Sequence, residues 1–508
     1  MIRNKNHYIT ILIILLIFLM RIPVINNAPA EAIDMWRQCD TESIARNFIN
    51  HEFNIFKPQF NYDGPLPNYI QLEFQITTFI IAILYRIFGK HYFLARLVPL
   101  IFFMISVYYL YKIVEKIYGI KAAWITIIIY GILPLNLFYS RAIMPESAAL
   151  CFFNGAFYYF YKTIQSDLNN VIPNAVEESL VLKPRSFVSH VHTDGLRMTK
   201  KRISDILLAG IFTALAISQK TPAIFIGLAF LFMCIDRYGL GFIKQIRLWV
   251  FATIALIPPI AYILYSGHIA EFKFVEGIGS KLILPKFMTA IFSPEAITFY
   301  RYNLSGGFTK LIFLLGVVGL FTLTSRRDRP ILYWTIAIIL EVIVIVSVIK
   351  FRYYMIFLTP VISILAGRVL YLLESQLKYI GGIAVVLIFI YTGYSSYNLV
   401  KDDFIVREEV LDFGRVIDEY TNEEDLIVIG YHDPVRISIS NRQGWRVQEI
   451  EQLQRYIDLG ADYFILDENG IYNDDGSFRE YLDDNFEMKL VEGKYLFYDL
   501  ELRLHSKS

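Results

Sequence analysis

The sequence predicts an all-α polytopic membrane domain followed by a small α/β domain. Of the 508 residues, 55% are hydrophobic and only 19% are charged. Most apolar residues are gathered into runs of about twenty, the length that a helix needs to cross a bilayer. After residue 400 the pattern changes to short apolar segments between charged residues. These observations predict a membrane domain over 1–400 and a soluble domain over 401–508.

Eleven apolar runs are long enough to span the membrane. Because lipid offers no partners to backbone N–H and C=O groups, each run is expected to be helical. The runs cover residues 8–25, 94–115, 121–138, 144–162, 204–220, 222–236, 246–266, 309–324, 331–349, 353–373 and 380–397. The first run resembles a signal peptide, but it is long and lacks a clear cleavage site, so we interpret it as a retained helix.

A further run, Gln71–Phe88, is expected to lie along the membrane surface. Its uninterrupted apolar core, Phe79–Tyr85, is too short to span, and Glu73 and Gln75 lie near its start. With this segment left out of the count, the basic loops fall on the side of the N-terminus, as the positive-inside rule requires. These loops contain Lys112, Lys116 and Lys121; Arg237, Lys244 and Arg247; and Arg326, Arg327 and Arg329.

This topology predicts which segments lie on each side of the membrane. Residues 26–93 and 267–308 form external loops, and 163–203 form a polar cytoplasmic loop. The tail after residue 400 also lies outside the cytoplasm. In the tail, Asp425–Gly430 and Ala461–Asp467 have the pattern of buried strands. Helical spacing precedes each of them, in EEVLDFGRVIDEY and EIEQLQRYIDLG, and FEMKLVEGKYLFYDL predicts a hairpin that turns at Glu492-Gly493.

The first external loop concentrates ionisable residues next to the membrane. Asp40 precedes a helical pattern that includes Ile44 and Phe48, so one interpretation makes it a helix N-cap. A carboxylate held against the bilayer loses hydration, which raises its pKa and suits it to act as a general base. Asp40 and Glu73 are therefore candidate catalytic residues. Arg37 is expected either to pair with Asp40 or to face a phosphate.

Five other acidic residues of this loop are expected to be solvated. They are Glu31, Asp34, Glu42, Glu52 and Asp63. Metal binding is not expected, because the eight histidines form no H-x3-H or HExxH pattern. The three cysteines are far apart and predict no disulfide framework. A net charge of +1 gives no indication of nucleic-acid binding.

Several segments occur in an order that resembles a known family. They read WRQCDTESIARNF, PNYIQLEFQ, LYRIFGKHYFLARLVPL, FYSRAIMPES and SQKTPA. Together they resemble polytopic glycosyltransferases of family 39 and their bacterial relatives, such as protein O-mannosyltransferases and aminoarabinose transferases of lipid A. The resemblance is strong over residues 8–240, thinner over 241–400 and weak in the tail. It implies the C-type glycosyltransferase fold and inverting transfer of a sugar from a polyprenyl-phosphate donor, with an acidic loop residue as base.

The resemblance assigns roles to individual acidic residues. Asp40 matches the loop aspartate of the family, and Glu73 matches its second acidic position. The chain reads EFQIT from Glu73, where relatives have a basic residue and paired prolines, so a phosphate contact there is not supported. Glu146 matches a further acidic position at an external helix end. Its other interpretation is a first-turn acid favoured by the helix dipole, and Arg141 could pair with it.

A lipid-phosphate donor needs cations at the external surface. Short external loops offer Arg141, Lys220, Lys350 and Arg352. Lys220 and Arg352, with the adjacent Tyr353, are the candidate donor-binding residues, and Lys350 is a weaker one. The alternative is that these residues anchor the helices at the membrane interface.

The sequence thus predicts a membrane glycosyltransferase that needs no cofactor. Its partners would be a polyprenyl-phosphate sugar and a lipid, glycan or protein acceptor, and its place a bacterial plasma membrane with the active site outside the cytoplasm. The alternative is a transporter or flippase of lipid-linked sugars, which would carry ionisable groups near the bilayer midplane. Glu341 is a possible example of such a group.

Overall fold

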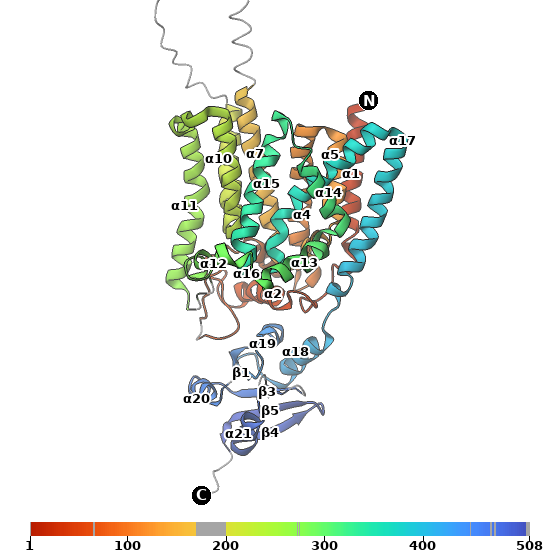
Figure 1. Ribbon diagram of the computed structural model, residues 1–508. Coiled ribbons are helices and arrows are strands. Elements are labelled where there is room, and N and C mark those ends of the chain that lie inside the picture. The colour runs from red at the N-terminus through yellow and green to blue at the C-terminus, as the bar shows by residue number, and fades with distance from the viewer. Residues whose placement is uncertain are drawn as a thin grey trace, which may run out of the picture.

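The structure is a bundle of helices with a small sheet domain at one end (Figure 1). This computed structural model describes residues 2–64, 67–168, 200–271, 273, 275–447, 449–467, 470–471 and 474–503. Most of the predicted cytoplasmic loop, residues 169–199, lies outside the described residues.

Each of the eleven apolar runs falls on helical backbone. The helices are α1 (Ile2–Leu19), α4 (Tyr92–Tyr118), α5 (Ile120–Ile132) with α6 (Pro134–Tyr139), α7 (Glu146–Leu168), α9 (Lys200–Gln219), α10 (Ile226–Tyr238), α11 (Ile246–Ile269), α14 (Lys310–Leu320), α15 (Arg329–Glu341) with α16 (Ser347–Ile349), and α17 (Leu358–Val400).

By length and composition, six helical segments of the described chain can cross a membrane, or seven if one bent pair is counted as a span. Three further runs fall on helices that are too short by that measure: α5, α14 and the apolar part of α9, Ile203–Gln219. The protein is therefore an integral membrane protein with several spans, some of them short or broken.

The last two predicted spans are the two halves of α17, which are separated by a break where the chain reverses direction. Inside α17, Lys378 has φ +44° and ψ −115°, which breaks the helix. The first half packs closely on α14: a Cβ added to Gly316 of α14 would touch the Ile362 side chain. Leu314, two residues earlier in α14, shares a groove with Leu387 of the second half. In Figure 1 this second half descends beside the bundle and leads into the sheet domain.

The segment expected along the membrane surface is α3 (Ile76–Phe88), and it stays at one end of the bundle. Before it, the Phe74 N–H donates to the Ser218 carbonyl at the end of α9. After it, Arg96 in the first turns of α4 donates to the Ala28 carbonyl. Both flanks of α3 thus lie at the end that carries the first loop, so α3 does not cross the bundle.

The basic loops meet at the opposite end of the bundle. Asp328 pairs with Arg368 at 2.8 Å, and Lys121 pairs with Glu374 at 2.9 Å near the reversal of α17. Arg329 pairs with Asp236 at the end of α10. Figure 1 places the N-terminus at this end and the sheet domain at the other, as an odd number of spans requires.

The second predicted external loop contains two helices that the sequence analysis did not anticipate. They are α12 (Leu284–Ala290) and α13 (Pro294–Phe308), and their axes are bent by 83°. Ser293 caps α13 by accepting a bond from the Ala296 N–H. Both helices lie at the end of the bundle nearest the sheet domain (Figure 1).

The sheet domain has five strands in the order β2-β1-β3-β5-β4. β1 pairs in parallel with β2 and β3, and β5 pairs antiparallel with β3 and β4. The elements are α18 (Glu408–Tyr420), β1 (Leu426–Ile429), α19 (Val435–Ser440), β2 (Gln443–Arg446), α20 (Ile450–Asp458), β3 (Tyr463–Leu466), α21 (Ser477–Asn485), β4 (Phe486–Val491) and β5 (Tyr495–Arg503). The predicted strands are β1 and β3, and the hairpin turns at Glu492 and Gly493, both with positive φ.

The sheet domain is attached to the first external loop at two places. Glu31 forms an antiparallel bridge with Val406, and Tyr62 forms a parallel bridge with Gly444 on the edge strand β2. Helix α2 (Met35–Asn50) lies between this domain and the bundle (Figure 1). Its polar residues are therefore buried on every face over residues 38–48. A domain boundary at residue 400 stays a prediction.

Candidate active site

Asp40 lies in the middle of α2 and not at its N-terminus. The helix begins at Met35, so the interpretation of Asp40 as an N-cap is wrong. The side chain is 3% exposed and accepts a hydrogen bond of 3.1 Å from the Tyr62 hydroxyl, which in turn accepts one from the Trp36 indole N–H. Burial raises the pKa of Asp40 to about 7, although Arg37, Tyr62 and Arg446 lower it in part.

The sheet domain contributes part of the surroundings of Asp40. Arg446 of β2 donates to Asp63 at 2.8 Å and lies over the rings of Trp36 and Tyr62. Trp36 also meets His432 edge-to-face, with ring centroids 6.1 Å apart. Asp40 thus faces the contact between α2 and the sheet domain.

Arg37 pairs with Glu73 and not with Asp40. The two side chains form an ion pair between α2 and the segment that precedes α3, and both are only partly exposed. The backbone of Glu73 is held by the Tyr262 hydroxyl of α11, at 3.5 Å from the Glu73 carbonyl oxygen. This ion pair links the two loop segments that carry the predicted acidic residues.

Glu146 and Lys220 form a buried ion pair at the external ends of two spans. The Nζ–Oε1 distance is 2.6 Å, and the side chains are 0% and 9% exposed. Lys220 also lies 4.5 Å from the ring centroid of Tyr353 and 5.5 Å from that of Tyr354. The structure therefore brings Glu146, Lys220 and Tyr353 together. Arg141, offered as a partner of Glu146, pairs instead with Glu31 at 2.7 Å.

Arg352 begins the 3-10 helix Arg352–Phe357 and points toward the start of the tail. It donates to Asp403 at 2.8 Å, and both side chains are partly exposed. Lys350, two residues earlier, has a left-handed backbone with φ +57°. Its Nζ donates to the Val348 carbonyl oxygen at 3.5 Å. Arg352 is thus held by the tail through Asp403.

Asp34 is a residue of this region that the sequence analysis placed in solvent. It precedes α2 in a left-handed conformation, φ +50° and ψ +31°, without capping the helix. Its Oδ2 accepts a hydrogen bond of 2.6 Å from the Tyr139 hydroxyl. Burial raises its pKa, as does the charge of Glu146, while Arg352 and Lys220 lower it. Asp34 therefore lies within the electrostatic reach of both donor-binding candidates.

Other acidic residues expected to be solvated are also buried. Glu31 is 0% exposed and pairs with Arg96 at 3.2 Å as well as with Arg141. Glu42 is 1% exposed and pairs with Arg46 at 2.8 Å. The prediction failed because it treated the loop alone, whereas the bundle and the sheet domain cover the loop from both sides. A sequence signal did exist in Arg96, which stands near the start of the predicted span 94–115 without an assigned partner.

The predicted site residues thus form two groups. Glu146, Lys220, Arg352 and Tyr353 gather near Asp34, and the charges of Arg37, Glu146 and Asp34 also act on the Tyr353 hydroxyl. Asp40 lies apart from these cations except Arg37. Within the described chain, no group of three His, Cys, Asp or Glu side chains is arranged to hold a metal ion.

Comparisons with known proteins bear on the fold. Residues 76–172 match the family model of dolichyl-phosphate-mannose-protein mannosyltransferase. A search of curated proteins by sequence found no significant match.

Solved structures resemble the chain over nearly its whole length. ArnT from Cupriavidus metallidurans, bound to undecaprenyl phosphate, superposes with a TM-score of 0.66 at 13% identity, covering 98% of each chain. Its apo form gives 0.65 at 12% identity with the same coverage. AglB, the archaeal oligosaccharyltransferase from Archaeoglobus fulgidus, in complex with an inhibitory peptide and a dolichol-phosphate, gives 0.59 at 13% identity over 97% of this chain and 74% of that one. The chain has the C-type glycosyltransferase fold that these membrane proteins share.

Proposed function

We propose that the chain is an inverting membrane glycosyltransferase. It would transfer a sugar from a polyprenyl-phosphate donor to a lipid, glycan or protein acceptor on the extracytoplasmic face. The family match over residues 76–172 and the likeness to structures with bound undecaprenyl phosphate or dolichol-phosphate support this class of donor. The basic loops at the opposite end of the bundle support the sidedness.

The observation that carries the proposal is the grouping of Lys220 and Arg352 near Asp34. Cations that can neutralise a phosphate and a carboxylate that can take a proton lie at one external end of the bundle: Lys220 lies 4.5 Å from the ring centroid of Tyr353, the neighbour of Arg352, and Asp34 accepts a hydrogen bond from Tyr139. Tyr353 lies against Lys220 and would border the same space. A transferase of this type needs both kinds of group around one sugar.

The chemistry follows from these roles. An acceptor hydroxyl attacks the anomeric carbon of the sugar from the face opposite the phosphate, and its proton passes to a carboxylate. The bond between the anomeric carbon and the phosphate oxygen breaks, and the lipid phosphate leaves with the electron pair. Lys220 and Arg352 stabilise the charge that develops on that phosphate. Because Glu146 and Asp403 already hold these cations in place, they need not reorganise during the step.

Two aspartates can serve as the base. Asp34 is favoured by its place near the donor-binding cations and by its partial exposure. Asp40, the residue matched by the family resemblance, is favoured by a pKa of about 7, close to the ideal for a base near neutral pH. Glu73 would act through Arg37, whose guanidinium it holds.

The transporter alternative is not favoured. Glu341 ends α15, is fully buried, and neither carboxylate oxygen has a hydrogen-bond partner among the described residues. One such glutamate makes no continuous path of ionisable groups across the bundle, and the solved structures with this fold include an oligosaccharyltransferase.

The direct test uses purified protein in nanodiscs, radiolabelled polyprenyl-phosphate sugars, and membrane extracts as acceptors. Transfer of label to an extract component supports the proposal, and movement of the lipid without cleavage of the sugar–phosphate bond contradicts it. In the same assay the double variant Lys220→Met/Glu146→Gln removes the buried pair as a unit, which protects the fold. We expect a loss of at least about 100-fold in turnover. Lys281→Met, an exposed lysine of the second external loop, is the matched control.

A further inference from the structure

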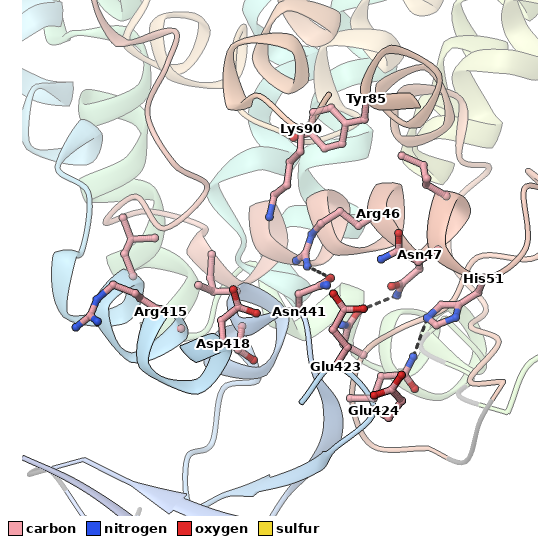
Figure 2. A pocket seen from close by; sticks show the side chains of 18 of the residues that line it. Arg46, Asn47, His51, Tyr85, Lys90, Arg415, Asp418, Glu423, Glu424 and Asn441 are labelled. Carbon is pink, nitrogen blue, oxygen red and sulfur yellow. Dashed lines mark hydrogen bonds between the residues drawn. The ribbon is translucent and has the colours of Figure 1, made fainter. Parts of the chain in front are cut away.

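A large polar cavity lies between the first external loop and the sheet domain, away from Asp34. Its volume is about 1080 Å³, which is at the upper end for small-molecule sites. Figure 2 shows that the last turns of α2, the start of α4 and the sheet domain contribute its walls. Neither the donor nor the proton transfer of the proposed function uses it.

The cavity is lined by groups that bind hydroxyls. Side-chain amides recur around it, from Asn47, Asn50, Asn61, Asn441 and Gln443. Asn47 and Asn61 bond to each other and to backbone carbonyls, so Asn50, Asn441 and Gln443 are the amides that can meet a ligand. Amides both donate and accept hydrogen bonds, which matches the alternating needs of neighbouring sugar hydroxyls. The Gln443 Oε1 is buried and has no hydrogen-bond partner among the described residues, although its amide nitrogen meets His51 at 2.9 Å.

The cavity has no excess of positive charge to favour a phosphate ligand, because its cations are matched by carboxylates: Lys90, Arg46 and Arg415 against Asp418, Glu423 and Glu424. Arg46 is neutralised by Glu42, and Arg415 pairs with Glu419 and Glu492. Glu423 and Glu424 are exposed at the rim, close to the amides in Figure 2. An anion would meet these two carboxylates, whereas a neutral or amino sugar could donate hydrogen bonds to them.

The position of the cavity points to the acceptor. Tyr85 and Tyr92 line the cavity where α3 ends and α4 enters the bundle. The cavity therefore borders the external surface of the bilayer that the chain spans. Arg46 lies six residues beyond Asp40 on α2, which is about 9 Å along the helix. A glycan seated here could extend along α2 toward the aspartates, while a donor held by Lys220 and Arg352 would stay on the other side.

We propose that this cavity binds the non-reacting part of a carbohydrate acceptor, a neutral or amino-sugar oligosaccharide. This assignment rests on the proposed function, because it names the acceptor class of the same enzyme. The amides and the Glu423–Glu424 pair recognise hydroxyl and amino groups, and the tyrosines at the membrane side provide apolar faces for sugar rings.

The test measures binding separately from transfer. Full-length protein in nanodiscs is applied to an array of defined oligosaccharides of two to eight units that includes neutral, amino and acidic sugars. We expect binding of neutral or amino-sugar members, and at least a tenfold loss of affinity in Glu423→Ala/Glu424→Ala and in Asn50→Ala. Glu449→Ala/Glu451→Ala, an acidic pair of the same domain outside the cavity, is the matched control.

Three results would overturn the proposal: no oligosaccharide bound by the wild-type chain, equal binding by the cavity variants, or competition by inorganic phosphate. Retention of undecaprenyl phosphate by the nanodisc-embedded protein is measured in parallel. Oligosaccharide binding that depends on the cavity, without any sugar transfer, would remove the proposed function and leave the cavity as a glycan site. Transfer with an unchanged acceptor KM in the variants would remove the cavity assignment alone.

Discussion

Asp34, just before α2, and Asp40, inside α2, occupy different environments. Asp34 stands at the helix start, partly exposed, with Tyr139 as its hydrogen-bond donor and with Lys220 and Arg352 nearby. Asp40 is buried against the sheet domain, with Tyr62 as its donor. Asp40 lies inside α2, whereas Asp34 precedes the helix with a left-handed backbone. Burial raises the pKa of both carboxyls, so a raised pKa alone does not identify the reacting group; the neighbouring cations distinguish them.

The largest expected effect separates these two residues by activity. Asp34→Asn should reduce turnover by about 100- to 10,000-fold, because a general base contributes that much, while donor binding is retained. Asp40→Asn should keep turnover within about tenfold of the wild type, since it keeps the shape and the contact with Tyr62. Both variants are measured in the radiolabelled transfer assay.

The reverse ranking, with Asp40→Asn inactive and Asp34→Asn active, would assign the base to Asp40. Circular dichroism and thermal unfolding of both variants would ensure that a loss of activity is not a loss of fold.

The second effect concerns the buried charges that hold the Asp34 side. Glu31→Gln leaves Arg96 and Arg141 without their carboxylate, and all three side chains are fully buried. Removing one partner of a buried pair costs about 3–5 kcal/mol. We expect a large drop in Tm of the purified protein. An unchanged Tm would mean that the backbone carbonyls around the two arginines suffice.

The third effect is a dependence of stability on pH that comes from Asp40. Its folded pKa of about 7 lies above the value of the unfolded chain, so the folded state binds more protons between about pH 4 and 7. Stability from this group is therefore greatest at low pH and is lost as the pH rises to 7. Asp40→Asn should reduce the difference in Tm between pH 5 and pH 8. A difference as large as in the wild type would show that other groups, such as Asp34, dominate it.

The smallest effect concerns the anchor on the Asp40 side. Asp63 and Arg446 are partly exposed, so breaking this pair should cost only about 1 kcal/mol. Arg446→Gln should also raise the pKa of Asp40, because it removes one of the charges that lower it. If Asp40 is the base, the acid limb of the pH–rate profile should move upward. If Asp34 is the base, that limb should stay in place.

The membrane helices and the sheet could be predicted because their patterns are local. Apolar runs mark spans whatever their neighbours, and β1, β3 and the hairpin follow from strand patterns and a Glu-Gly turn. The surface position of α3 followed from charge parity, which constrains the whole chain at once. The reversal at Lys378 lies in the gap between the predicted spans 353–373 and 380–397, whereas the bend between α12 and α13 depends on packing and could not be predicted in this way.

The site was predictable in its residue types and not in its pairings. Lys220, Arg352 and Glu146 were identified individually, but their partners come from helices far apart in sequence. Asp34 was missed because the residues of a polar loop were assumed to be exposed to solvent. Helix α2 has a narrow apolar face around Ile44 and Phe48 and is polar elsewhere, a pattern that usually indicates one exposed side, but the bundle and the sheet domain bury it from both sides.

The attachment of the tail to the first loop has a practical consequence. A version cut after Val400 would leave the residues of α2 that meet the tail, such as Arg46 and Asp40, open to water. Such a fragment would keep its spans in the bilayer but lose the sheet domain that covers α2. A minimal enzyme should therefore include the residues beyond Val400, and a blocking antibody could be directed against them, because they border the candidate active site.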